Sequence, residues 1–104
     1  MPIQVHVDLT IDSTREAEAV RYFETVFRPA AQKFEGYRDV RMLKLRAVPY
    51  GPAPAGLDYR FAITYDSEEL RQKWVSSDIH QEVWGAMERM LADPNYTVLL
   101  FDVT

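Results

Sequence analysis

The chain has 104 residues, enough for one domain with a modest hydrophobic core. Its hydrophobic fraction of 47% and charged fraction of 27% are ordinary for a soluble globular protein. The absence of cysteine excludes disulfides, thiolate nucleophiles and cysteine-based metal sites, and the net charge of −4 argues against nucleic acid and anionic membranes as partners.

The first predicted element is a strand over residues 3–11, where apolar and polar residues alternate with the period of a β-strand. A helix is predicted from Ser13 to Phe34, because Ser13 and Glu16 have the spacing of a capping box and apolar residues then recur at helical intervals. Pro29 removes one backbone hydrogen bond and predicts a kink or break within this helix. Gly36 suits the left-handed conformation that ends a helix.

A second strand is predicted over residues 37–48, with a slip in its alternation that indicates a bulge or burial of both faces. Residues 49–56 contain three prolines and two glycines and form a loop, long enough for a lid or a partner contact. A third strand follows over 57–65. The second helical region begins at Ser67, breaks at 76–78 with a new N-cap, and ends at 93–95, before a last strand over 96–103.

This order of elements, β-α-β-β-α-β, predicts an α+β ferredoxin-like fold with a four-stranded antiparallel sheet and both helical regions on one face. The odd-numbered residues of the first strand are expected beneath the helices, and Gln4, His6, Asp8 and Thr10 on the open face. The last strand is apolar on both sides, which indicates that both become buried. We therefore expect a homodimer that closes sheet against sheet; a monomer with a solvated polar face is the alternative.

Targeting and membrane signals are not expected in this sequence. No apolar run approaches the roughly 20 residues of a membrane span, and no signal peptide precedes the first predicted strand. We expect residues 1–104 to form a single cytoplasmic domain that binds neither membrane nor nucleic acid.

Two consecutive segments carry a resemblance to a known group of proteins. Residues 65–70 combine an aromatic strand end with an acidic helix start, and residues 74–80 place a Trp before a small polar turn and a second helical piece. This pattern resembles the dimeric α+β barrel superfamily, which includes antibiotic biosynthesis monooxygenase-like domains and stress-responsive A/B barrel-like proteins. The resemblance extends over the whole chain in element order, but the residues that carry it lie mainly between 61 and 84. It implies pairing into a dimeric α+β barrel, on a scaffold that hosts many functions.

The activity that the resemblance implies depends on which members are compared. Heme-degrading members combine an Asn on the first strand with a helical Trp and an axial His ten residues later. Trp74 matches the Trp, but Trp84 stands at the later position and the only Asn is Asn95, so heme degradation is not expected. The resemblance to members that work without metal or flavin implies a cofactor-independent monooxygenase or cyclase for an aromatic or polyketide-like molecule. The alternative is a non-catalytic, small-ligand-binding or stress-associated dimer.

Candidate site residues cluster in the second helical region. His80 is the candidate general base, because imidazole titrates near neutral pH and this residue lies close to a predicted helix start. The resemblance and the aromatic pattern together nominate Tyr65 as a hydroxyl donor and four residues as contacts for a flat aromatic substrate: Trp74, Trp84, Tyr22 and Tyr59. The structural alternative is that His80 is a surface or capping residue and that the aromatic residues are plain core.

Other polar residues offer weaker signals. His6 and Asp8 point to one face of the first strand, where they form either an oriented imidazole–carboxylate pair or a polar pair on a solvated or interface surface. No helical spacing of His and carboxylates suggests a metal site, so neither metal nor other cofactor is expected. A basic group in the second strand can bind a carboxylate or form a charged strand edge; it comprises Arg38, Arg41, Lys44 and Arg46.

Overall fold

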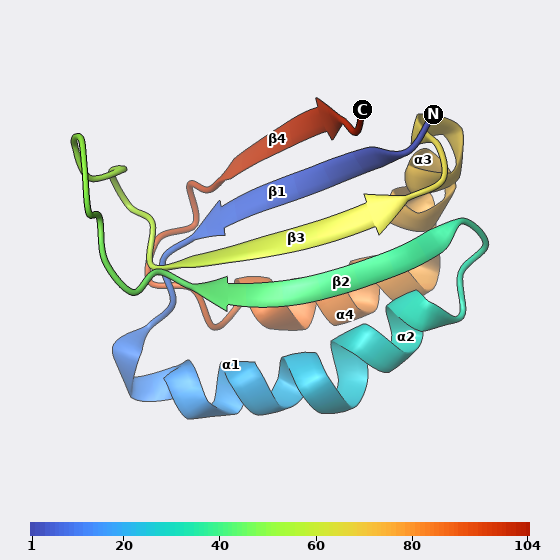
Figure 1. The fold of residues 1–104 in the computed structure, drawn as a ribbon. Coiled ribbons are helices and arrows are strands. Elements are labelled where there is room, and N and C mark those ends of the chain that lie inside the picture. Colours follow the sequence, from blue (N-terminus) through green and yellow to red (C-terminus); the bar gives the residue numbers. More distant parts are fainter.

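The computed structural model describes all 104 residues and contains one four-stranded antiparallel sheet with helices packed on one face (Figure 1). The strands are β1 (Ile3–Leu9), β2 (Tyr37–Lys44), β3 (Tyr59–Tyr65) and β4 (Thr97–Asp102), in the spatial order β2-β3-β1-β4. The helices are α1 (Glu16–Tyr22), α2 (Arg28–Gln32), α3 (Glu68–Ser76) and α4 (Asp78–Glu88). The predicted ferredoxin-like α+β fold is confirmed. None of the helices combines the length and apolar character that a membrane span requires.

Alternation along the two central strands separates the core from the open face of the sheet. Residues Ile3, Val5, Val7 and Leu9 of β1 are buried beneath the helices, as predicted. The same period in β3 buries Tyr59, Phe61, Ile63 and Tyr65. The core holds 18 residues and no charged side chain, so apolar packing rather than a buried polar network holds the helices against the sheet.

A π-helical turn, Phe23–Phe27, divides the first helical region between α1 and α2. α2 then begins with Pro29 in its first turn. Proline has no N–H to donate, and a wider turn just before it lets the N–H of Arg28 bond to the carbonyl of Phe23. The predicted break at Pro29 is confirmed, and the wider turn directs Phe27 into the core, where it is fully buried.

The predicted capping box at the start of this helix is wrong. Asp12, not Ser13, accepts the N–H of Thr14 at 2.9 Å, and residues Ser13–Arg15 form a 3₁₀ turn before α1. The Glu16 carboxylate accepts a hydrogen bond from the Tyr59 hydroxyl at 2.6 Å and lies 2.9 Å from the Lys44 ammonium. These two partners from the sheet, one of them charged, hold the carboxylate away from the backbone N–H of its own helix.

The break between α3 and α4 follows from two serine caps. The Ser67 hydroxyl accepts the N–H of Leu70 at 3.2 Å and starts α3. The Ser77 hydroxyl accepts the N–H of His80 at 3.1 Å and starts α4. Both caps satisfy N–H groups that have no partner in the first turn of a helix. The predicted break is confirmed, and it places His80 in the first turn of α4.

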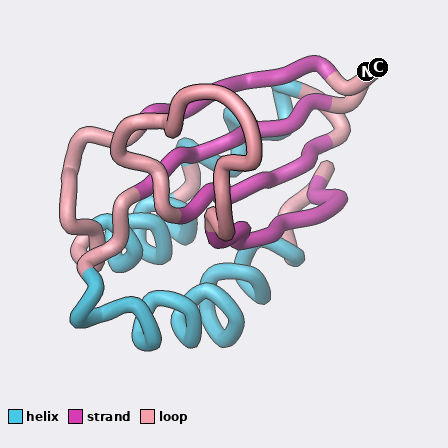
Figure 2. The backbone as a smooth tube through the Cα atoms, turned by 60° about the vertical axis from the view of Figure 1, so that its left-hand side comes forward, coloured by secondary structure: helices cyan, strands magenta, loops and turns pink.

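The second strand is shorter than predicted. β2 ends at Lys44, and its register against β3 shifts between Tyr37 and Asp39, which confirms the predicted irregularity. The following irregular segment projects beyond one end of the sheet, at the opposite end from the paired chain termini (Figure 2). The termini are tied together, since the N–H of Val103 donates to the carbonyl of Pro2 at 3.0 Å.

β4 lies at one edge of the sheet and is exposed along its whole length. Its register against β1 places Leu99 opposite His6 and Phe101 opposite Gln4, so these two apolar side chains lie on the open face. Val98 and Leu100 point to the helix side and are about half exposed, at 49% and 51%. The apolar pattern of this strand is therefore left uncovered within one chain.

Replacing Gly36 with Ala is expected to destabilise the fold by about 2 kcal/mol. Gly36 has a φ of +89°, and an added Cβ would lie 2.6 Å from the Leu70 side chain. Urea unfolding of Gly36→Ala measures the loss. Gly51→Ala is the matched control, because Gly51 has a φ of +84° but no atom within 4 Å of the added Cβ. Equal losses in the two variants would show that contact with Leu70 is unimportant.

Candidate functional site

A cavity of about 530 Å³ lies between the β1–β4 side of the sheet and the two helices α3 and α4. The volume is within the range of small-molecule sites. The cavity walls are mostly apolar and come from every strand of the sheet except β2. The main residues of the walls are Val5, Val7, Phe27, Ile63, Tyr65, Trp74, Val75, His80, Trp84 and Val98, with Arg71, Gln81, Glu88 and Tyr96 adding polar groups.

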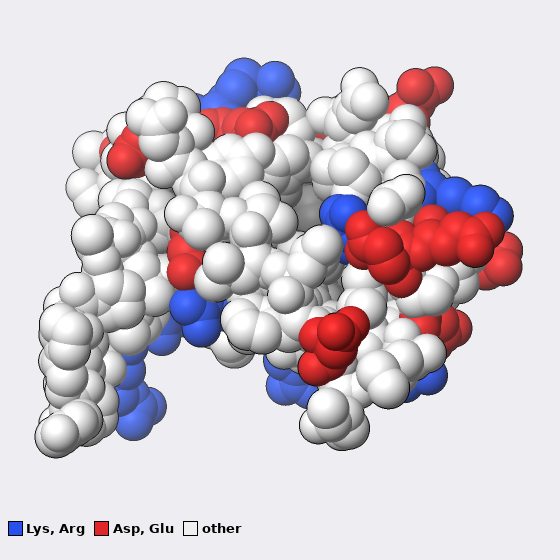
Figure 3. All heavy atoms as spheres, turned by 90° about the horizontal axis from the view of Figure 1, so that it is seen from above, with Lys and Arg blue, Asp and Glu red and all other residues white.

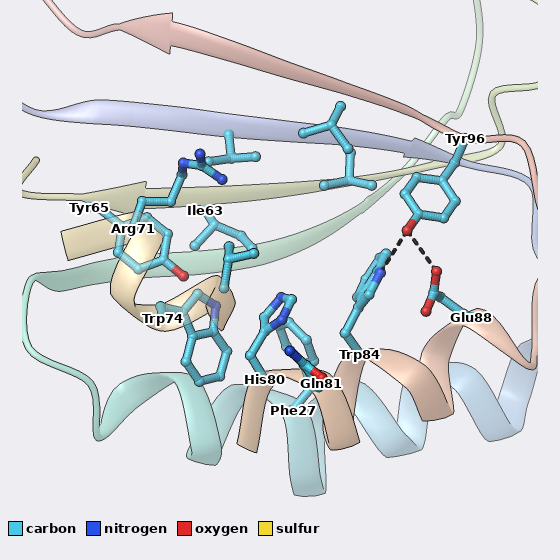
Figure 4. Close-up of a pocket in the computed structure, with 14 residues that line it drawn as sticks. Phe27, Ile63, Tyr65, Arg71, Trp74, His80, Gln81, Trp84, Glu88 and Tyr96 are labelled. Atoms are coloured by element: carbon cyan, nitrogen blue, oxygen red, sulfur yellow. Dashed lines mark hydrogen bonds between the residues drawn. The ribbon is translucent and has the colours of Figure 1, made fainter. Parts of the chain in front are cut away.

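The His80 imidazole lies between the two Trp side chains at the floor of the cavity (Figure 4). The Trp74 ring is 5.0 Å from it, centroid to centroid, and stands edge-on at 79°. The Trp84 ring is 6.5 Å away and nearly parallel, at 17°. The imidazole Nδ1 is buried and has no hydrogen-bond partner. His80 is thus neither a solvent-facing residue nor a helix cap through its side chain.

The surroundings of His80 favour the neutral imidazole. Burial lowers the pKa of His80 below its ordinary value of 6.5, since the charged form loses hydration in an apolar cavity. The Val75 carbonyl and the Glu88 carboxylate oppose the shift, and the Arg71 guanidinium adds to it. At neutral pH the ring is therefore uncharged and able to accept a proton.

Two buried polar groups near His80 have no partner in the protein. The Tyr65 hydroxyl and the Trp74 indole nitrogen are both shielded from solvent, and neither makes a hydrogen bond. Figure 4 shows them pointing toward the same region, between β3 and α3. Burial raises the pKa of Tyr65 well above the ordinary range, so the hydroxyl keeps its proton and can donate it. Arg71 stands at the same end of the cavity, in an ion pair with Glu68 at 2.6 Å.

The other end of the cavity carries a closed hydrogen-bond chain. The Trp84 indole N–H donates to the Tyr96 hydroxyl at 3.0 Å, and that hydroxyl donates to the Glu88 carboxylate at 2.7 Å. Burial, together with the Glu88 carboxylate, raises the pKa of Tyr96. The chain fixes the plane of Trp84 and places the one carboxylate of the cavity wall opposite the end that holds Tyr65 (Figure 4).

Four of the six predicted site residues meet in this cavity: His80, Tyr65, Trp74 and Trp84. Tyr22 is partly buried against the core and Tyr59 is buried, but neither lines the cavity. The Tyr59 hydroxyl instead donates to Glu16, and burial and this carboxylate raise the pKa of Tyr59 to about 12. Substrate contact by these two tyrosines stays a prediction that their positions do not support.

Sequence reasoning missed Glu88, Tyr96, Arg71 and Phe27 as parts of the cavity wall. A usable signal existed for Glu88, because His80, Trp84 and Glu88 follow one another at intervals of four and so form one stripe on α4. Tyr96 comes from the segment before β4 and reaches this stripe only through the fold. Phe27 enters because of the π-helical turn, which periodicity alone does not reveal.

The open face of the sheet holds the other histidine, and most of its polar groups are paired among themselves, although the buried His6 Nδ1 has no partner. Asp8 accepts two hydrogen bonds from Arg60, at 2.6 and 3.1 Å, and does not orient His6. The His6 Nε2 lies 2.6 Å from the Gln4 side-chain oxygen, and Gln4 donates to Thr64 at 3.1 Å. No cluster of three or more His, Asp or Glu side chains suited to a metal ion forms.

The basic residues of β2 also have acidic partners. Arg38 pairs with Asp66, Arg41 with Asp39 at 2.8 Å, and Lys44 with Glu16 at 2.9 Å. These pairs favour the charged strand edge over a carboxylate-binding site. The loop 49–56 contributes no residue to the cavity wall, so it does not act as a lid in this structure.

No family model matches the sequence, and no curated protein matches it. Solved structures do match. A dimeric ferredoxin-like protein of unknown function from Jannaschia sp. CCS1 has a TM-score of 0.81 at 13% identity, over 99% of this chain and 100% of that one. A putative antibiotic biosynthesis monooxygenase from Caulobacter crescentus CB15 has a TM-score of 0.79 at 14% identity, over 99% and 90%. A member of the ethyl tert-butyl ether d (ethd) family from Bacillus halodurans c-125 has a TM-score of 0.73 at 17% identity, over 100% of each chain.

At identities this low, the similarity establishes a shared fold but not a shared activity, because one scaffold supports many activities. The similarity nonetheless extends over nearly the whole of each chain. The chain has the ferredoxin-like fold that these structures share.

Proposed function

We propose that this protein is a cofactor-independent oxygenase or cyclase that binds a flat aromatic, polyketide-like molecule in the cavity between the sheet and α3–α4. The observation that carries the proposal is the neutral His80 imidazole enclosed between two Trp rings. Trp rings provide apolar, planar surfaces for an aromatic ligand, and an uncharged imidazole is the group that a proton-abstraction step needs.

The chemistry begins with removal of a proton from a phenol or from an activated ring carbon. His80 takes this proton, and the electron pair remains on the substrate as a delocalised anion. For an anthrone-type substrate, the anion then reacts with molecular oxygen. One ring CH₂ becomes C=O, one O₂ is consumed and one water is released, so that the substrate supplies the electrons. The apolar walls support this step because they exclude water from the reacting anion.

A panel of phenolic and anthrone-type compounds tests this proposal. Oxygen uptake is measured with an electrode at neutral pH, and product formation is followed by the absorbance of the quinone. The proposal requires at least one compound to be consumed with one O₂ per product, at a rate that depends on His80. Tight binding of compounds with no turnover would instead support the second candidate, a ligand-binding protein. The unpartnered Tyr65 and Trp74 groups favour that candidate, because they can hold a ligand without chemistry.

We also propose that the chain forms a homodimer through the open face of the sheet. This face carries Leu99 and Phe101 beside the polar row of β1 and β3, whose charges are already paired. Surfaces of this kind are rarely left uncovered in a monomer, and apolar edge strands invite association. Seen from above, uncharged atoms cover much of the surface; the largest group of acidic and basic side chains lies at the right-hand end, and smaller ones are scattered elsewhere (Figure 3).

Replacing Phe101 with Asp is expected to weaken this dimer by more than about 100-fold, because an unpaired carboxylate is costly to bury. Phe101 is 46% exposed in one chain, so the folded monomer tolerates the change. Light scattering at micromolar concentration gives the mass of both proteins. Ile79→Asp is the matched control, since Ile79 is 49% exposed on α4, on the other side of the sheet. A single-chain mass for the unchanged protein would contradict the proposed dimer.

A further inference from the structure

Besides the His80 Nδ1, two polar groups in the cavity lack partners, and their chemistry defines what a ligand must offer. The Trp74 indole N–H is a donor only, and the Tyr65 hydroxyl donates when it stays protonated. Both atoms are buried, and both residues are 1% exposed. Buried polar groups in proteins are nearly always hydrogen-bonded, so two such donors at one end of a cavity call for an acceptor from outside the chain.

The two ends of the cavity differ in charge. At the α3 end, the Arg71 guanidinium is close enough to lower the pKa of both Tyr65 and His80. At the other end, the Glu88 carboxylate faces the cavity and accepts a hydrogen bond from the neutral Tyr96 hydroxyl. Glu68 pairs with Arg71 and offsets part of its charge, so the repulsion from Glu88 is the main reason that an anion is favoured beside Trp74 and Tyr65.

We propose that Trp74 Nε1 and the Tyr65 hydroxyl form an oxyanion subsite that selects ligands carrying an ionisable phenol or enol oxygen and orients that oxygen toward α3. This rests on the proposed function, because His80 must take the proton of the same ligand. The ligand O–H bond breaks, the proton passes to a ring nitrogen of His80, and the electron pair stays on the oxygen. Donors that are already in place stabilise this oxyanion more than the neutral hydroxyl from which it came.

Position supports the assignment, since the Trp74 ring lies 5.0 Å from the His80 ring, centroid to centroid. An oxygen held by the Trp74 N–H therefore lies close to the imidazole that accepts its proton (Figure 4). Trp74 and Tyr65 are then more than walls: they contact the atom that gains the charge. The closed chain of Trp84, Tyr96 and Glu88 has no free donor to offer an oxyanion.

Binding of a matched pair of probes tests the subsite without turnover. 4-Nitrophenol ionises and changes colour, whereas 4-nitroanisole has a methyl group in place of the proton and cannot ionise. We expect bound 4-nitrophenol to show the absorbance of the phenolate at a pH where the free compound is mostly neutral. Tyr65→Phe removes one donor and keeps the ring, so it should raise the Kd for 4-nitrophenol about tenfold. The Kd for 4-nitroanisole should change less than about twofold, because this compound carries no charge and so has no charge-assisted hydrogen bond to lose.

Tyr22→Phe is the matched control, a tyrosine outside the cavity whose substitution should change neither Kd. Trp74→Phe provides a second variant with the same expectation should Tyr65→Phe fold poorly, as judged by circular dichroism. The subsite is rejected if bound 4-nitrophenol stays neutral, if both probes weaken equally, or if neither probe binds. If 4-nitrophenol binds as the phenolate but no compound supports oxygen uptake, the subsite stands and the oxygenase is rejected. If oxygen is taken up but bound 4-nitrophenol stays neutral, the oxygenase stands and the subsite is rejected.

Discussion

Replacing His80 with Ala is expected to lower kcat/KM for oxygen uptake by about 10²- to 10⁴-fold, the range over which a positioned general base acts. The imidazole is the only group in the cavity wall that is both neutral and basic at neutral pH. Removing it leaves the Trp walls in place, so ligand binding should persist while proton removal fails. Oxygen uptake and ligand binding are measured on the same preparation to separate these two steps.

A control and a pH profile make this prediction specific. His6→Ala removes the other histidine, which lies on the opposite face of the sheet, and should leave the rate per active site near that of the unchanged protein. Because burial lowers the pKa of His80 below its ordinary value of 6.5, more than half of the imidazole is still neutral at pH 6.5. The decline in the rate of the unchanged protein should therefore have its midpoint below pH 6.5, and His80→Ala should lack this decline. Equal rates in both proteins would remove His80 from the mechanism.

Replacing Phe27 with Ala is expected to destabilise the fold by about 3–5 kcal/mol, as deletion of a buried aromatic ring usually does. Phe27 is 0% exposed and lies where the two helical regions and the sheet meet. Its ring centroid is 5.5 Å from that of Phe61, 6.3 Å from Trp74 and 6.1 Å from Trp84. The loss includes the transfer of the ring to water and the hole left among these neighbours. Urea unfolding at constant pH measures it.

The neighbouring residue offers a matched comparison within the same turn. Val26 is 39% exposed, so Val26→Ala should change the stability by less than about 0.5 kcal/mol. Phe27→Leu keeps most of the buried volume and serves as a milder variant that folds even where Phe27→Ala does not. A loss below about 1 kcal/mol in Phe27→Ala, the typical effect of an arbitrary substitution, would show that this turn is not part of the core.

The strands and the caps of α3 and α4 could be predicted because their causes lie close together in the chain. The alternation of β1 decides which of its side chains face the helices, and Ser77 caps α4 through a residue only three positions away. The cap at Asp12 was not predicted, because the partners that decide it lie far away in the chain. Glu16 completes a capping box in the sequence, but Tyr59 and Lys44, more than 25 positions away, supply stronger partners.

The cavity depended on relationships that no local pattern contains. Trp74 and Trp84 could be predicted as a pair of aromatic walls, but the sequence could not separate a filled core from an open space, because that depends on how far α4 lies from β4. Tyr59 and Tyr65 share one face of β3 and the same period, yet one is bound to Glu16 and the other ends in the cavity. The position of each along the strand relative to the helices, not the residue type, makes the difference.

The sequence by itself determined the order of the elements, the buried face of each central strand, and the two-part helix that carries His80. Hydrophobic periodicity and N-capping are short-range effects, and they determine local structure before any tertiary contact forms. Only the tertiary structure decided that His80, Trp74 and Tyr65 surround one space, with Arg71 at one end and Glu88 at the other. That arrangement arises because side chains from β1, β3, β4, α3, α4 and the π-helical turn border an apolar gap without filling it.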